Sequence, residues 1–168
     1  MKGFIATATI ASLVLGMNCA YALDMKPGEW KMENTHIHIV DDVSGTVLMD
    51  QKNVDTSMQL CYTEKMSEDA KKMKKGDTTG SGGSNITFVE NNDTRQISET
   101  ICNQDGTKTN SLVETTKVSD TEFAMKMKMS IDSAERKMTT TQTIKQTYVG
   151  KTCTESTRAE MEARAEVK

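Results

Sequence analysis

EFAMKMKMSI, residues 122–131, is the stretch of sequence that decides the fold. Large apolar residues occupy every second position from Phe123 to Ile131, and small, charged or polar residues alternate with them. Successive side chains of a strand point to opposite faces of a sheet, so this period of two places the large apolar residues on one side. The stretch therefore predicts an antiparallel strand with one buried face and one face in water.

Similar segments lie on both sides of this strand, and short clusters of Asn, Asp, Gly and Ser of hairpin length connect most of them. Further strands are predicted at residues 30–40, 46–62 with a break near 52–53, 86–90, 94–102, 108–118 and 136–149. Because short links make successive strands antiparallel neighbours, we expect a meander that curves into an open sheet or a half-open barrel. No alternation of helix and strand is visible, which disfavours a parallel sheet.

One short helix is expected after the second of these strands. Thr63 is a good N-cap residue, and apolar residues recur at helical spacing from Met66 to Met73. Lysines crowd the end of this segment, where they complement the helix dipole, and Gly76 follows in the position of a helix stop. The pattern predicts a helix over residues 64–75, packed on or beside the sheet.

Two segments fall outside this arrangement of strands and helix. TTGSGGS, residues 78–84, lacks the Gly-Lys-Ser/Thr ending of a phosphate-binding Walker loop, so we expect a flexible solvated loop. Residues 154–168 are rich in Glu, Arg and Ala and carry no apolar stripe at helical spacing. Thr157 and Glu160 could cap this charged tail as a helix, and we expect the tail to project from the domain or fray.

The first 22 residues predict a cleavable signal peptide. Lys2 supplies a basic start, residues 4–17 form an apolar run, and Ala-Tyr-Ala at residues 20–22 places small residues where a signal peptidase cleaves. The run is shorter than the ~20 residues that span a bilayer. A buried N-terminal helix is the alternative interpretation. Cys19 lacks the residues that precede a lipidated cysteine, so we expect it to be removed with the signal.

The remaining sequence predicts one β-rich domain over residues 23–153. The full chain carries 21 basic and 24 acidic residues, a net charge of −3, which argues against nucleic acid as a partner. We expect no transmembrane segment after signal cleavage, and a location in the periplasm of a Gram-negative bacterium, or secretion. Only 4% of the residues are aromatic, so little bulk is available for a core and a disulfide would matter more than usual.

Three cysteines remain after cleavage: Cys61, Cys102 and Cys153. Pairing is expected in an oxidising compartment. An odd count leaves one thiol free or available for an intermolecular bond, and the sequence pattern alone does not say which.

Three segments, taken in order, resemble one known family: LDMKPGEWKME at residues 23–33, MQLCYTEKM at 58–66 and YVGKTC at 148–153. They are similar to the secreted proteobacterial family catalogued as domain of unknown function 3617. Its members open with Pro-Gly-x-Trp, carry a Cys-Leu-Thr-Pro-Glu-like motif and end with Gly-x-Cys. The resemblance spans residues 23–153.

This chain departs from the family pattern at two places. No proline follows Cys61, and the cysteine that many members carry shortly before the position of Cys102 is missing. If the family pairs its middle cysteines with each other and its outer ones together, the resemblance implies a disulfide between Cys61 and Cys153 and leaves Cys102 alone. The resemblance implies a location and an architecture but no activity.

The methionines and histidines are the candidate metal ligands. The chain has 13 methionines, and thioethers are soft ligands suited to Cu(I). Met125, Met127 and Met129 would project from one strand face, and His36 and His38 from one face of another strand. Core packing of the methionines is the favoured alternative, because Met is an adaptable filler of cores. Exposed strand histidines are favoured over a structural zinc site, which needs four ligands.

Catalysis is not expected. A nucleophilic Ser or Cys needs a histidine base, but the two histidines lie together on one early strand and no Gly-x-Ser-x-Gly motif is present. Asp and Glu are abundant, and their spacing alone does not identify or exclude a catalytic carboxylate pair. We predict no catalytic residue, no cofactor and no enzyme activity.

The sequence favours an exported, non-catalytic envelope protein that binds a small apolar ligand or another envelope component. The reason is architectural, because a curved sheet with few bulky aromatics can leave a concave and partly apolar groove. One alternative is a periplasmic protein that binds copper or another metal through its Met and His faces. Another is a structural or partner-binding module that uses the charged tail as its contact.

Overall fold

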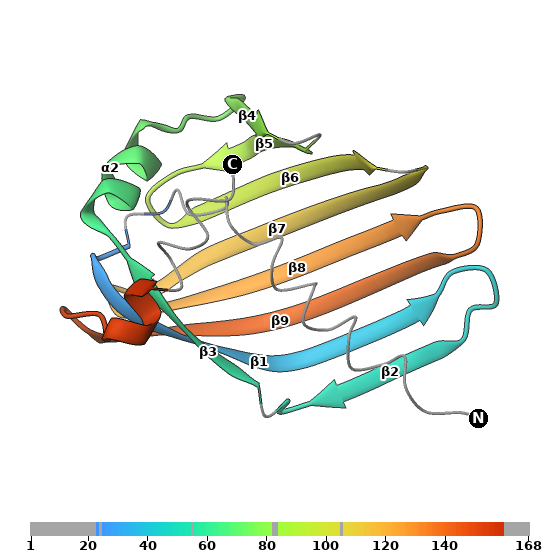
Figure 1. Cartoon of the computed structure of the whole chain (residues 1–168), viewed down its shortest axis with the longest axis horizontal. Coiled ribbons are helices and arrows are strands. Elements are labelled where there is room, and N and C mark those ends of the chain that lie inside the picture. The colour runs from blue at the N-terminus through green and yellow to red at the C-terminus, as the bar shows by residue number, and fades with distance from the viewer. Residues whose placement is uncertain (1–22, 24, 55, 82–83, 105, 160–168) are drawn as a thin grey trace.

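The computed structural model describes residues 23, 25–54, 56–81, 84–104 and 106–159, which form a nine-stranded antiparallel sheet with two helices at one end (Figure 1). The predicted signal peptide, residues 1–22, lies outside the described residues, as do residues 160–168 of the predicted tail. The elements are β1 Gly28–Asp41, β2 Val47–Lys52, β3 Ser57–Tyr62, α2 Glu64–Lys72, β4 Thr78–Ser81, β5 Ser84–Asn91, β6 Arg95–Gln104, β7 Thr107–Ser119, β8 Glu122–Asp132 and β9 Lys137–Gly150. No helix in the described part of the chain is long and apolar enough to cross a membrane.

The strand order explains why the sheet stays open. It runs β2-β1-β9-β8-β7-β6-β5-β4, with β3 pairing with β1 as well. From β4 to β9 each strand pairs with the next along the chain, as short links require. The first strand, β1, then pairs with the last, β9, over most of its length. The two ends of the path, β2 and β4, are not paired with each other, so the predicted open antiparallel sheet is confirmed.

The strand predicted over residues 46–62 is broken where the sequence indicates. β2 pairs with the second half of β1, and β3 pairs with its first half, so both lie along the same edge of β1. Between them Asn53 adopts a left-handed φ of 51°, a conformation that asparagine tolerates better than most residues. The break lets one segment of chain cover nearly the full length of β1.

The helix begins where predicted and ends three residues early. Thr63 caps α2, and its hydroxyl accepts a hydrogen bond from the amide of Met66 at 3.2 Å. Met73 is already extended, so the last lysines of the predicted helix lie in the following turn. Gly76 has a φ of 87° in that turn, and its amide donates to the carbonyl of Phe88 at 2.7 Å. This contact holds the turn after the helix against β5.

The glycine-rich stretch after α2 is only partly a loop, which corrects the prediction for residues 78–84. Thr78–Ser81 form β4, an antiparallel partner of β5. Backbone pairing with a free sheet edge does not need large side chains, so a sequence without an apolar pattern can still form a short edge strand. Residues 82–83 lie outside the described part of the chain.

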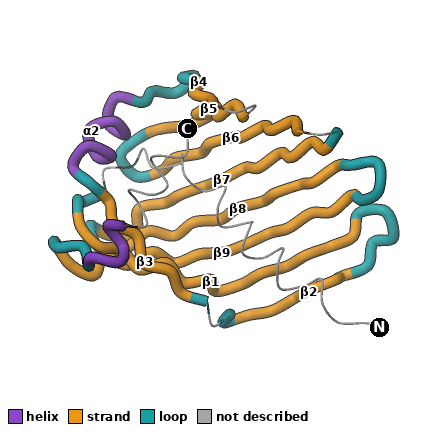
Figure 2. Tube along the Cα trace, in the orientation of Figure 1, coloured by secondary structure: helices purple, strands orange, loops and turns teal. Residues whose placement is uncertain are grey.

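Both helices lie at the same end of the sheet, and the strands form one layer (Figure 2). An apolar cluster lies at this end, around the fully buried Trp30. The centre of the Trp30 ring lies 5.3 Å from that of Phe123 and 5.2 Å from that of Tyr148. The indole N–H of Trp30 donates to the carbonyl of Lys26 at 2.9 Å. Aromatic contacts of this kind stabilise beyond the area that they bury. A single tryptophan therefore anchors the end of the sheet where the start of β1 pairs with the end of β9.

The structure joins Cys61 to Cys153 by a disulfide and leaves Cys102 free, which is the pairing that the family resemblance implies. Cys61 is on β3, and Cys153 follows β9, so the bond connects the two strands that flank the start of β1. Glu29 of β1 is buried beside them, and its carboxylate accepts the amide of Thr154 at 2.7 Å. The covalent link and this hydrogen bond fix the chain after β9 against β1.

The described part of the tail packs against the domain instead of projecting from it. Residues 155–159 are helical, and the hydroxyl of Thr154 accepts the amide of Thr157 at 3.5 Å. Thr154 is therefore the cap, whereas the sequence pointed to Thr157 with Glu160. Thr157 is buried, and Glu160 lies outside the described residues. The contact of Thr154 with Glu29, which the local sequence does not show, decides where the helix begins.

Candidate functional site

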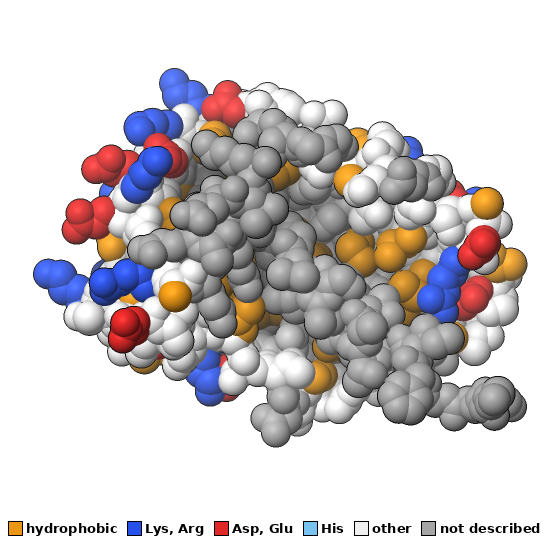
Figure 3. Space-filling view, in the orientation of Figure 1, with side chains coloured by type: hydrophobic (Ala, Val, Ile, Leu, Met, Phe, Trp, Pro, Cys, Tyr) orange, Lys and Arg blue, Asp and Glu red, His pale blue; other side chains and the backbone are white. Residues whose placement is uncertain are grey.

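The candidate site is the inner face of the sheet, defined by the side chains on the same side as Phe123, Met125 and Met127. These three residues of β8 are at most 3% exposed, so the buried face predicted from the alternating sequence is confirmed. The same face of the neighbouring strands carries Met32, Val113 and Ile144, which pack against the β8 methionines, and further hydrophobic clusters lie to either side. In Figure 3 charged side chains gather toward the two ends of the visible face, and hydrophobic ones lie between them.

The inner face is also unusually polar for a buried surface. Six polar residues on it are at most 3% exposed: Gln96, Ser98, Thr115, Thr140, Gln142 and Gln146. The strand register places them in rows with the methionines, since Met127 lies between Val113 and Gln142, and Met125 lies beside Thr115. Directly opposed residues of neighbouring strands are in side-chain contact. The inner face is therefore a mosaic in which hydrogen-bonding groups alternate with thioethers and aliphatic groups.

Several of these buried groups make no hydrogen bond to another protein group in the described part of the chain. Among the described residues, the buried polar side-chain atoms without a partner are Thr115 Oγ1, Thr140 Oγ1, Gln142 Oε1, both amide atoms of Gln146, and Asn34 Oδ1 near the bulge of β1. Leaving one buried polar group unsatisfied costs about 1–3 kcal/mol. Natural proteins rarely keep several such groups together unless water or a ligand satisfies them. The inner face therefore offers donors and acceptors to a bound molecule.

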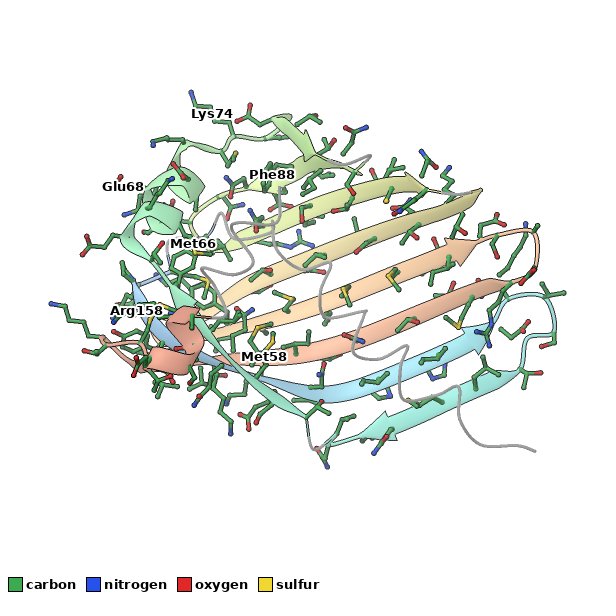
Figure 4. The ribbon with its side chains drawn as sticks, viewed as in Figure 1. Met58, Met66, Glu68, Lys74, Phe88 and Arg158 are labelled. Atoms are coloured by element: carbon green, nitrogen blue, oxygen red, sulfur yellow. A yellow bond between two sulfur atoms is a disulfide. The ribbon has the colours of Figure 1, made fainter. Side chains whose placement is uncertain are left out.

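The predicted thioether candidates occupy this face as a packed row. Met125 and Met127 are buried, and Met129 is partly exposed. Figure 4 shows that Met58 of β3 and Met66 of α2 lie toward the end of the sheet that carries the helices. The two histidines lie on the opposite side, because Ile37 and Ile39, which alternate with them on β1, are buried on the inner face. The methionines and histidines therefore do not form one joint site.

His36 and His38 lie on the outer face, where the structure adds a residue that sequence reasoning missed. Asp50 of β2 lies directly across from His38, and its Oδ1 is 2.7 Å from His36 Nε2 and 3.8 Å from His38 Nδ1. The hydrogen bond from His36 holds the pKa of Asp50 below its ordinary value, and the charges of both histidines and of Lys52 act in the same direction. The sequence predicts that these two strands form a hairpin, but it does not give the register that places Asp50 opposite His38.

The rest of the outer face carries charged and polar side chains together with Leu112, which is 45% exposed beside Lys128. Lys126 and Lys128 of β8 are exposed there, as the alternating sequence predicts. Lys145 of β9 pairs with Glu122 of β8 at 2.9 Å, and this carboxylate raises the pKa of Lys145. Exposed pairs of this kind contribute little to stability. The outer face is therefore largely exposed to solvent and carries one histidine cluster.

A cleft of about 430 Å³ lies between α2 and the turns at that end of the sheet. Its lining is mainly charged and comprises Lys26, Pro27, Glu64, Ser67, Glu68, Lys71, Lys117 and Asp120. Lys117 pairs with Asp120 at 2.7 Å, and that ion pair holds the pKa of Asp120 below its ordinary value. This cleft is not the partly apolar groove that the sequence led us to expect. Ligands with an apolar body fit the chemistry of the inner face better.

Cys102, the free cysteine, lies on β6 next to Thr109 in the strand register. It shares the inner face with Ser98, from which it is four residues removed along the strand. Its side chain is partly buried. The structure shows no disulfide partner for it among the described residues.

Comparisons with known proteins identify a family and supply no activity. The family model described as "Protein of unknown function (DUF3617)" matches residues 25–153. Two relatives, each described as "Uncharacterized protein YtgA" and found in Salmonella typhimurium and Salmonella typhi, are 48% identical to the chain over 158 residues. Each alignment covers 94% of this chain and 98% of the relative. No solved structure matches the chain.

Proposed function

The chain belongs to the DUF3617 family of proteins of unknown function, and on that premise we propose that it is an exported, non-catalytic protein that binds a small, largely apolar ligand on the inner face of its sheet. The observation that carries the proposal is the set of buried, unpartnered polar atoms between the methionines. A ligand with an apolar body and a few hydrogen-bonding groups matches both components of that face.

The distribution of these atoms indicates how such a ligand would lie. Gln142 and Gln146 lie on the same strand, β9, and Ile144 lies between them on the same face. Thr140 continues the row, and Thr115 lies two strands away. The polar atoms thus follow the direction of β9. An elongated molecule aligned with this strand could place its polar groups against the amides and its apolar groups against Met125 and Met127.

The absence of catalysis in this proposal rests on where the histidines are. The sequence has two histidines, and both lie on the outer face, where one is hydrogen-bonded to Asp50. No imidazole base is therefore available to a nucleophile on the inner face. Binding, without chemistry on the ligand, is the simpler reading of that face.

The proposed location is the periplasm of a Gram-negative bacterium. The disulfide between Cys61 and Cys153 supports it, because such bonds persist in oxidising compartments. The apolar run at residues 4–17, followed by small residues at 20 and 22, supports export.

Native mass spectrometry of the protein purified from the periplasm tests ligand binding. We expect a ligand adduct in the unaltered protein that disappears in Gln142→Leu and Gln146→Leu. Leucine removes an unsatisfied buried group without adding a charge, so both variants should fold with unchanged or increased stability. Thr141→Val, on the same strand but on the outer face, is the matched control and should keep the adduct.

Two results would contradict the proposal. One is a protein that carries no small-molecule adduct although its disulfide is formed. The other is an adduct that survives equally in the two inner-face variants and in the Thr141 control. Co-purification of another envelope protein with no small molecule would point instead to a partner-binding module.

A further inference from the structure

We propose that His36, His38 and Asp50 form a binding site for a divalent transition-metal ion, of the Zn²⁺ or Cu²⁺ type, on the outer face of the sheet. Within the described residues these three form the one group of His, Cys, Asp or Glu side chains whose ligand atoms lie close enough to share an ion. All three ligand atoms lie within 4.8 Å of one another.

The hairpin of β1 and β2 places the three ligands on one surface. His36 and His38 are two residues apart on β1, so their side chains point to the same face. Asp50 is the direct cross-strand partner of His38, which brings a carboxylate beside both imidazoles. The two imidazole rings are tilted relative to each other, with their centres 6.3 Å apart. The register of the β1–β2 hairpin therefore brings all three ligands together.

The separations of the ligand atoms suit a small ion. Zinc binds histidine nitrogen and carboxylate oxygen at about 2.0–2.2 Å, which puts neighbouring ligands of a tetrahedral ion about 3.3 Å apart. The two measured separations from Asp50 Oδ1, 2.7 Å to His36 and 3.8 Å to His38, lie on either side of that value. Small side-chain rotations would equalise them. An ion would take the place of the direct hydrogen bond between His36 and Asp50.

The chemistry of the donors selects the class of ion. Imidazole nitrogen suits Zn²⁺, Cu²⁺ and Ni²⁺, whereas Ca²⁺ and Mg²⁺ prefer sites built from oxygen alone. Cu(I) prefers thioethers, and the methionines of this chain lie on the inner face. The side chains of His36, His38 and Asp50 are 36%, 34% and 54% exposed, so an ion can reach the site from solvent. Three protein ligands leave a coordination position for water.

The charge of Lys52 gives a second test of where the ion binds. Lys52 is the cross-strand partner of His36 and carries a positive charge on the same hairpin. A cation bound at Asp50 would be repelled by this ammonium, by an amount limited by solvent screening. Removing the charge in Lys52→Gln should therefore tighten metal binding by about two- to fivefold, most clearly at low salt.

Titration calorimetry with ZnCl₂ and, separately, CuCl₂ tests the site on the disulfide-bonded protein purified from the periplasm and freed of metal. We expect one ion per chain. His36→Gln, His38→Gln and Asp50→Asn should each weaken binding more than about tenfold, because loss of even an indirect partner of a metal ligand costs 10–100-fold. The side chains are exposed, so the variants should keep the melting temperature of the unaltered protein without metal.

Three control variants assign the binding to this site. Asp132→Asn removes an exposed carboxylate elsewhere in the sheet, Cys102→Ser removes the free thiol, and Met127→Leu removes a thioether of the inner face. All three should bind the ion as the unaltered protein does. Loss of binding in Met127→Leu or Cys102→Ser would move the site elsewhere and overturn the proposal, as would a complete absence of binding. Retained binding in all three ligand variants would do the same.

This inference does not depend on the proposed ligand site, because the two lie on opposite faces of the sheet. Metal binding can fail while the inner-face adduct is found, and the reverse holds as well. Each experiment therefore tests its own proposal.

Discussion

Removing the disulfide is the perturbation whose effect the structure allows us to work out most fully. Cys61 and Cys153 are 92 residues apart in sequence, so their bond closes a loop that contains most of the domain. In the chain-entropy model a loop of this length destabilises the unfolded state by about 4–5 kcal/mol. Total stabilities of domains are only about 5–15 kcal/mol, so the bond contributes a large fraction of the total.

The double variant Cys61→Ala with Cys153→Ala should therefore lose about 4–5 kcal/mol of the free energy of unfolding. For a domain of this size the corresponding drop in melting temperature is about 15 °C. Urea titration followed by circular dichroism measures the free energy, and the slope of the titration should increase, because the unfolded chain without a cross-link exposes more surface. Each single alanine variant should also melt substantially lower, since it breaks the same bond.

Cys102→Ala is the matched control, because it removes a cysteine that forms no disulfide. We expect its effect to be much smaller than that of the other two. An equal loss of stability in Cys102→Ala, or a double variant that melts within a few degrees of the unaltered protein, would refute the reasoning. Peptide mapping that linked Cys102 to either of the other cysteines would refute the pairing itself.

Two further predictions concern the core and a turn. Met127→Ala should destabilise the domain by about 2–5 kcal/mol in urea titrations, because it leaves a cavity in a buried cluster. Met127→Leu keeps the side-chain volume and should cost less than about 1.5 kcal/mol. Equal losses of stability in the two variants would contradict the role of Met127 in the core. Asp41 accepts the amides of Ser44 and Val43, and these hydrogen bonds, that of Ser44 foremost, lower its pKa below 3.8. Because the pKa of Asp41 is lower in the folded state, its ionised carboxylate stabilises the fold above pH 3.8, and this stabilisation is lost as the pH falls through the folded pKa. Asp41→Asn should therefore lose less stability than the unaltered protein on acidification below pH 3.8. An unchanged acid slope in thermal melts would contradict it.

Much of the fold could be predicted from the sequence because apolar and polar residues alternate along its strands. The alternation in residues 122–131 gave the buried face of β8, and the Thr63 hydroxyl gave the start of α2. The break in the strand at residues 46–62 could also be located, because asparagine tolerates the left-handed backbone that it adopts there. These features depend on interactions within a few residues, which the local sequence contains.

The short links predicted the sequential neighbours among β5 to β9, but other contacts between distant or pattern-poor segments were harder to predict. Pairing of β1 with β9 joins the two ends of the domain, and no local link requires it. β4 forms where the sequence lacks an apolar pattern, because the edge of β5 accepts its backbone. The cap of the last helix is Thr154 rather than Thr157, because Glu29, far away in sequence, holds the Thr154 amide.

Both proposed sites show the same division. The sequence by itself determined that the methionines share one strand face and the histidines another, since side chains two residues apart on a strand point the same way. Only the tertiary structure decided that Asp50 completes the histidine cluster and that Gln142 and Gln146 are buried without partners. The period of a strand fixes which side chains share a face, but the register between strands, set by contacts along their whole length, fixes which of them meet.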